Sequence, residues 1–115
     1  MNVQQLNIEL IRKASFNEFD GDRVADDLIA NMPLWDGALM TRLGSLICLR
    51  DLACNPPYWN VDTLHVLSSG ENDEALCTLA ESWGPDEIDW VCPDDAARML
   101  GAYPAPARLL RVWWD

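Results

Sequence analysis

Two short polar segments contain residue types that bind ions or small ligands. One reads Ser68-Ser69-Gly70-Glu71 and the other Cys92-Pro93-Asp94-Asp95, and each follows a run of β-branched and aromatic residues. Each segment is therefore expected just after a strand and just before a helix. Open α/β sheets bind ligands at the carboxyl edge of their strands. The candidate residues for such a ligand-binding edge are Ser68, Ser69, Glu71, Cys92, Asp94 and Asp95.

The acids of this edge restrict what it can bind. Glu71, Asp73 and Glu74 fall in the first helical turn, where they complement the helix dipole and repel phosphate. The sequence contains no GxGxxG or GxxxxGK[ST] motif. Carboxylates suit a hard cation such as Mg²⁺ or Ca²⁺, but their spacing here lacks the regularity of an EF-hand loop. Helix capping explains the same residues more simply, so the sequence predicts neither a metal nor a cofactor.

Cys92 is the residue on which an enzyme could be built. A thiol between the end of a strand and the start of a helix has a lowered pKa. The only histidine, His65, lies two residues before the end of its own strand and could reach the same edge. A solitary histidine in a strand is more often structural, and a Cys–His pair needs both side chains in contact. The sequence therefore favours a non-catalytic protein over a Cys92-based enzyme.

Two features could contact a protein partner. In the helical pattern over 20–31, Asp22 and Asp26 stand one turn apart, and such a row could imitate nucleic-acid phosphates toward a basic protein. A solvated helix face is the simpler interpretation. Tyr58 and Trp59 add aromatic side chains of the kind enriched at interface hot spots. The candidate partner-binding residues are Asp22, Asp26, Asp27, Tyr58 and Trp59.

The charge balance limits the classes of partner. Nineteen acids face seven arginines and one lysine, for a formal net charge of −11. Such a surface repels nucleic acid and anionic membranes, so direct binding to either is not expected. A basic protein is the partner that this charge would attract, although solubility alone also accounts for it.

The cysteines and the hydropathy indicate the compartment. The four cysteines form no CxxC motif, and each lies in or beside an apolar run. No apolar run is long enough to span a membrane, and no basic and then apolar segment opens the chain. We expect a reduced, soluble, cytoplasmic protein.

The elements that must position these residues alternate in the second half of the chain. Strand patterns cover 61–67, 87–92 and 109–114, and helical patterns cover 72–83 and 93–101. This β-α-β-α-β order over residues 61–115 predicts a small, three-stranded, mainly parallel sheet. Right-handed crossovers favour the strand order 2-1-3, with the most apolar strand, 61–67, in the centre.

The first half reads as mainly helical and is expected to cover the sheet. Residues 2–14 fit a helix, although their alternation also fits an edge strand, and residues 22–31 fit a second helix. A third and longest helix is expected from 33–36 to about residue 54, flat against the sheet. The proline-rich connector 55–60 then separates residues 1–54 from the second half.

The expected fold is a single α/β domain over residues 1–115. An α+β fold with an extra N-terminal or antiparallel strand is the alternative, and the two edges of so small a sheet make a homodimer possible. The expected function is a non-catalytic protein-interaction module, regulatory or inhibitory, with a basic partner. The alternatives are a domain that binds a small ligand or cation at the sheet edge, and an enzyme based on Cys92.

Overall fold

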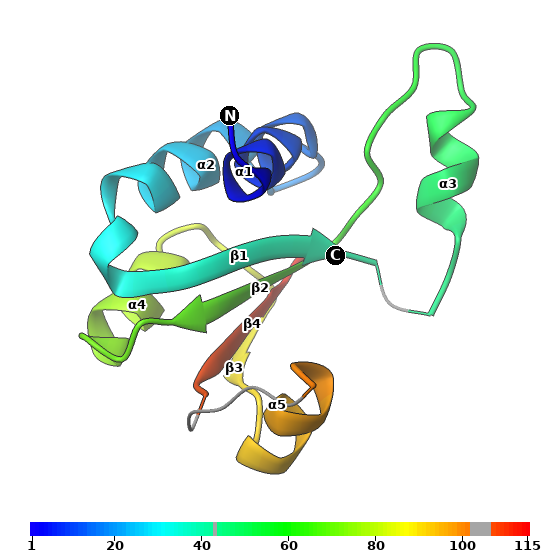
Figure 1. Ribbon diagram of the computed structural model, residues 1–115. Coiled ribbons are helices and arrows are strands. Elements are labelled where there is room, and N and C mark those ends of the chain that lie inside the picture. The colour runs from blue at the N-terminus through cyan, green and yellow to red at the C-terminus, as the bar shows by residue number, and fades with distance from the viewer. Residues whose placement is uncertain (43, 102–106) are drawn as a thin grey trace.

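The computed structural model describes residues 1–42, 44–101 and 107–115 (Figure 1). A four-stranded sheet stands at its centre, with helices on one face and a smaller helix at one end of the other (Figure 1). The strands are β1 (Trp35–Thr41), β2 (Thr63–Ser68), β3 (Glu87–Trp90) and β4 (Leu109–Trp113). The helices are α1 (Val3–Lys13), α2 (Gly21–Ala30), α3 (Ile47–Leu52), α4 (Asp73–Glu81) and α5 (Pro93–Met99), with a 3₁₀ turn η1 (Met32–Leu34).

The sheet has the order β1-β2-β4-β3, and all of its strand pairs are antiparallel. The prediction of a three-stranded, mainly parallel sheet of order 2-1-3 is therefore wrong. The crossover β2-α4-β3 does form, and β2 and β3 do run in the same direction. However, β4 enters between them and runs antiparallel to both. The molecule is a single compact α+β domain, which is the class of the alternative interpretation.

The extra strand is β1, and it replaces most of the expected third helix. Ala38 and Met40 face the core while Leu39 between them is exposed, as strand alternation requires. Gly44 has a φ of +74°, which a right-handed helix cannot contain. Leu43, also part of the expected helix, lies outside the described residues. Of the expected helix, α3 is the part that remains helical. In β1, the backbone N–H and C=O groups form hydrogen bonds with β2 in place of helical ones.

The other helices and strands lie close to where the sequence predicts them. The segment 2–14 forms helix α1 (Val3–Lys13) with Asn2 and Ala14 as its caps, so the edge-strand interpretation is wrong for this segment. Asn2 and Gln5 form a capping box at its start, and Asp20 caps α2. At Gly21, a Cβ atom would lie 2.3 Å from the Ile11 carbonyl oxygen, so α1 and α2 approach as closely as they do only because this residue is glycine.

The core lies between one face of the sheet and helices α1, α2 and α4. Leu64, Val66, Leu110 and Val112 supply its sheet side and are almost fully buried. Trp114 is 1% exposed, and its ring meets the Phe19 ring edge to face with 4.6 Å between the ring centres. Trp113 is half-buried on the sheet face opposite the core. Of the described helices, none is long and apolar enough to cross a membrane.

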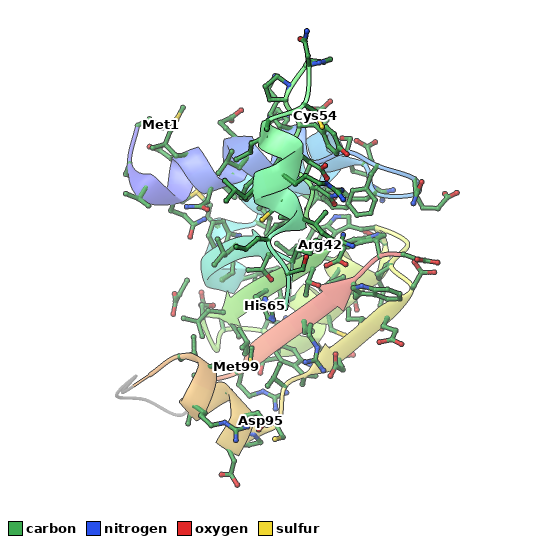
Figure 2. All side chains as sticks on the ribbon, turned by 90° about the vertical axis from the view of Figure 1, so that its right-hand side faces the viewer. Met1, Arg42, Cys54, His65, Asp95 and Met99 are labelled. Atoms are coloured by element: carbon green, nitrogen blue, oxygen red, sulfur yellow. The ribbon has the colours of Figure 1, made fainter. Side chains whose placement is uncertain are left out.

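The connection between β1 and β2 projects away from the rest of the molecule (Figure 1). We call residues 42–60 the arm; it contains α3 and the cis peptide bond between Asn55 and Pro56. The remainder of the chain is called the body. In Figure 2, Arg42 marks the root of the arm and Cys54 its far part. The sequence predicted a helix packed against the sheet up to about residue 54, followed by the connector 55–60. The structure instead confines the helix to α3 and places it apart from the sheet.

Candidate functional site

The expected ligand-binding edge is assembled only in part. Since β2 and β3 run in the same direction, Ser68 and Cys92 do leave the sheet at the same end. The start of β4 separates them: the Ser68 N–H donates to the Arg108 carbonyl, and the Val91 N–H donates to the Leu109 carbonyl, both at 2.9 Å. The two loops are therefore not adjacent.

Both serines of the first loop are occupied by contacts within the protein. The Ser68 hydroxyl donates to the Asp73 carboxylate and accepts the Gly70 N–H at 2.9 Å. The Ser69 hydroxyl donates to the Pro33 carbonyl at 2.6 Å and accepts the Glu71 N–H at 3.3 Å. These bonds hold the turn ahead of α4, and the cap itself is Asn72, whose side-chain oxygen accepts the Ala75 N–H at 3.0 Å.

Arg108 completes the contacts at this end of the sheet. Its Nε lies 3.0 Å from Asp73 Oδ2, and its guanidinium lies 4.4 Å from the centre of the Trp90 ring. The Ser68 hydroxyl, followed by Arg108, holds the pKa of Asp73 below its usual value. Asp73 is thus an ionised anchor between α4 and β4 and not a vacant ligand.

The second loop contains no assembled site. Cys92 is exposed and directly precedes α5, and Asp95 pairs with Arg98 one turn later. In the strand register, His65 of β2 and Asp89 of β3 both pair with Arg111, so β4 lies between them. Cys92 is a further three residues along the chain from Asp89. The structure does not bring Cys92 and His65 together. Among the described residues, Asp94 and the other acids form no group that could hold a metal ion.

The acidic face of α2 is partly neutralised by neighbouring helices. Arg12 of α1 reaches both Asp22, at 3.2 Å, and Asp26, at 3.0 Å. These two carboxylates, Asp26 before Asp22, raise the pKa of Arg12. Asp27 accepts the indole N–H of Trp83 at 2.8 Å, which fastens α2 to the end of α4. The row of carboxylates therefore presents less negative charge than the sequence implies.

The two aromatic candidates point to different surroundings. Tyr58 lies in the arm and is exposed, while Trp59 is partly buried against the core. They do not form one aromatic patch, and of the pair only Tyr58 is placed to meet a partner.

The exposed apolar residues of the arm were missed by the sequence reasoning. Leu46, Leu49 and Leu52 are 75%, 60% and 44% exposed, and their spacing of three places them along one side of α3. We call these three residues the leucine face. The same spacing suggested a buried helix. The signal against burial was that Gly44 and Pro56 isolate this short segment from its neighbours in the chain.

A buried carboxylate fixes the shape of the arm. The Asp51 side chain is 2% exposed, and Arg50 donates to it from Nε at 2.8 Å and from Nη2 at 3.1 Å. The Asn60 amide also donates to this carboxylate, and the Tyr58 N–H donates to the Asp51 carbonyl at 3.3 Å. The Cys54 Sγ lies 3.9 Å from Oδ1 of the same carboxylate, so all of these contacts come from the arm itself.

These hydrogen bonds keep Asp51 ionised. The Arg50 guanidinium, followed by the Asn60 amide, holds the pKa of Asp51 far below its usual value, and Asp51 in turn raises the pKa of Tyr58. Asp51 thereby joins α3 to the segment that returns to β2. The described residues of the arm form an element that presents its leucines, and Arg50 and Asp51 are bonded to each other within it.

The arm differs from the body in charge. Residues 42–60 carry +1, from Arg42 and Arg50 against Asp51, which leaves −12 on the rest of the chain. Arg42 lies 3.6 Å from Asp62 at the root of the arm. The arm therefore combines exposed apolar side chains with a net charge of +1, and residues 1–14 of this acidic protein do the same.

The sheet face opposite the core lies beside the arm, and we call it the open face. Three rows of residues cross it, as the strand register shows. The rows are Gly37, Leu67 and Leu109; then Leu39, His65, Arg111 and Asp89; then Thr41, Thr63, Trp113 and Glu87. The face is apolar toward β1 and acidic toward β3, and α5 packs on Leu109 at one end.

A hollow of about 480 Å³ opens on the apolar side of this face. Leu39, Leu67 and Leu109 line it together with His65, and Gly37 adds no side chain to fill it. Within the described part of the chain, the buried Nε2 of His65 has no hydrogen-bond partner. Burial, followed by the charge of Arg111, lowers the pKa of His65, so the ring is neutral near pH 7.

Comparison of the chain with family models, with curated proteins and with solved structures finds no match. The functional argument therefore depends on the arm, the open face and the acidic body.

Proposed function

We propose that this protein is a non-catalytic protein-interaction module that docks through the leucine face of its arm. The observation that carries the proposal is the combination of three exposed leucines, Leu46 at the N-cap of α3 and Leu49 and Leu52 within it, with the buried Asp51 carboxylate of the same short helix. If the arm served only to connect β1 and β2, polar residues at these three exposed positions would not reduce the stability of the protein. Leucines held outward by a polar network are suited to a partner.

The leucine face contributes part of the free energy that docking needs. Fully burying one leucine side chain contributes about 1.5–3 kcal/mol. Because these leucines are 75%, 60% and 44% exposed, burying what remains offers roughly 3–5 kcal/mol before the costs of association are subtracted. The Asp51 hydrogen bonds reduce those costs, because α3 is already formed in the free protein.

Charge does not direct this docking, in contrast to an interaction through α2. Apolar contacts are not screened by salt, whereas a basic partner on Asp22 and Asp26 would dissociate as ionic strength rises. Arg12 already bonds to both carboxylates, which favours the arm as the docking surface. Salt therefore distinguishes the two surfaces.

The test is affinity capture with matched variants. Tagged protein is incubated with a nuclease-treated lysate of the source organism supplemented with the untagged chain, and each bound protein is quantified at low and high salt. We expect Leu49→Asp to reduce binding of the partner at least tenfold at both salt concentrations. Leu6→Asp, which adds the same charge at a 51% exposed leucine of α1, should leave binding unchanged.

Two results would contradict the proposal. The first is a partner that Leu49→Asp retains and the double variant Asp22→Asn with Asp26→Asn loses; this would move the binding surface to α2. The second is the absence of any protein, the untagged chain included, whose binding depends on Leu49.

A further inference from the structure

We propose that the partner of the leucine face is a second copy of this chain, with each arm docked on the open face of the other copy. The inference rests on the proposed function and adds the identity of the partner. Its starting observation is that one molecule presents two apolar surfaces on neighbouring elements. One is the convex leucine face, and the other is the hollow beside Leu39.

The two surfaces fit each other in size. Helix α3 has six residues, so its axis is about 9 Å long and the helix with its side chains is about 10 Å wide. Four strands spaced about 4.8 Å apart give the open face a width of roughly 14 Å between its outer strands. One α3 helix is therefore wide enough to cover the apolar side of one open face, where Gly37 adds no side chain and Gln4 of α1 also lines the hollow.

Net charge, and not a particular ion pair, separates the arm from the body. Arg50 beside the leucine face is bonded to Asp51 at 2.8 Å, and Asp89 on the β3 side of the open face is bonded to Arg111 at 2.7 Å. No ion pair across the contact is therefore required. At the scale of the molecule, an arm of charge +1 meets a body of charge −12, whereas contact between two bodies would oppose like charges.

The arrangement permits a closed dimer. In Figure 2 the arm and the sheet near His65 are turned toward the same side of the molecule. A two-fold axis in front of that side places each arm over the open face of the other copy, which makes two identical contacts. The opposite face of the sheet is covered by α1, α2 and α4. A basic partner or a monomer is the competing outcome.

Sedimentation equilibrium of the full chain measures the dimer and its salt dependence. Because each copy carries −11, the dimer dissociation constant should fall several-fold when the Debye length is shortened from about 30 Å to about 10 Å. A protein that remains monomeric at millimolar concentration would overturn the inference.

Complementation between variants tests the arrangement. Leu49→Asp damages the arm and Leu39→Asp damages the open face, so each variant alone has two damaged contacts and should dimerise at least tenfold more weakly. An equimolar mixture retains one intact contact, between the unaltered arm of one copy and the unaltered face of the other. The mixture should therefore dimerise more strongly than either variant alone, and Leu6→Asp should behave as the wild type.

The remaining outcomes are also decisive. A mixture that associates no better than its components, or a dimer that withstands Leu39→Asp, would overturn the inference. Leu46→Asp serves as a second arm variant, and the circular dichroism spectrum verifies that each variant is folded. If the protein is monomeric and captures a different protein through Leu49, the proposed function stands and only the second copy is rejected.

Discussion

The body of this protein buries apolar side chains, whereas the arm buries a carboxylate and exposes leucines. In the body, Leu64, Leu76 and Leu110 are fully buried between the sheet and the helices. In the arm, Asp51 is buried and the leucine face is open to solvent. The body is thus stabilised by the hydrophobic effect, which is shared by many residues, and the arm by a few directed hydrogen bonds.

This difference indicates which region is shaped by stability and which by binding. Apolar burial makes the body one cooperative unit. Trp59 joins the arm to the core, and the local polar network at Asp51 holds α3, so its leucines stay available. The following changes test this division, in order of decreasing effect.

The largest effect is expected from Leu110→Ala in β4. The substitution leaves a cavity in the middle of the core and should lower the free energy of unfolding by about 3 kcal/mol. Urea denaturation followed by tryptophan fluorescence measures the change. Leu6→Ala in α1 is the control and should remain within about 0.5 kcal/mol of the wild type. A similar loss in both variants would mean that the body has no distinct core at Leu110.

An intermediate and local effect is expected from Asp51→Asn. The neutral side chain loses its ion pair with Arg50. Its own NH₂ group would also face the Asn60 NH₂ group, and two donors cannot bond to each other. Amide hydrogens of residues 47–60 should exchange at least tenfold faster, while those of β2 and β4 keep their protection. Asp36→Asn, at an exposed position of β1, is the control. Unchanged exchange in the arm would show that Asp51 does not hold it.

The smallest effect is expected from pH at His65, on the open face between Leu39 and Arg111, with Asp89 next along the row. Burial, and then Arg111, lowers the pKa of this ring, so above about pH 6.5 its contribution to stability is complete. As pH falls below that value, the unfolded chain binds more protons and the free energy of unfolding decreases.

His65→Gln should remove that part of the decrease. Urea denaturation of the wild type and the variant at about pH 7.5 and about pH 5 provides the comparison. Asp51 stays ionised over this range, so the arm does not contribute to the difference. An equal decrease in both proteins would show that His65 is not the group responsible.

The sequence by itself determined most of the local elements. Asn2 and Asp20 mark the starts of α1 and α2, and Gly84 with Pro85 ends the segment after α4. Alternation at 87–90 predicts a half-exposed strand, and β3 is indeed an edge strand. These features depend on neighbours in the chain, which the sequence displays directly.

Only the tertiary structure decided the direction of β4, the strand at 35–41 and the place of the arm. Strand direction leaves no mark on local alternation, and the spacing of Leu39, Met40 and Leu46 fits a helix until β2 offers backbone partners to β1. The bonds of Arg12 to Asp22 and Asp26, and of Asn60 to Asp51, join residues that sequence patterns treat as separate. Whether an apolar or acidic residue is buried, paired or exposed depends on these long-range contacts, which form only when the chain folds.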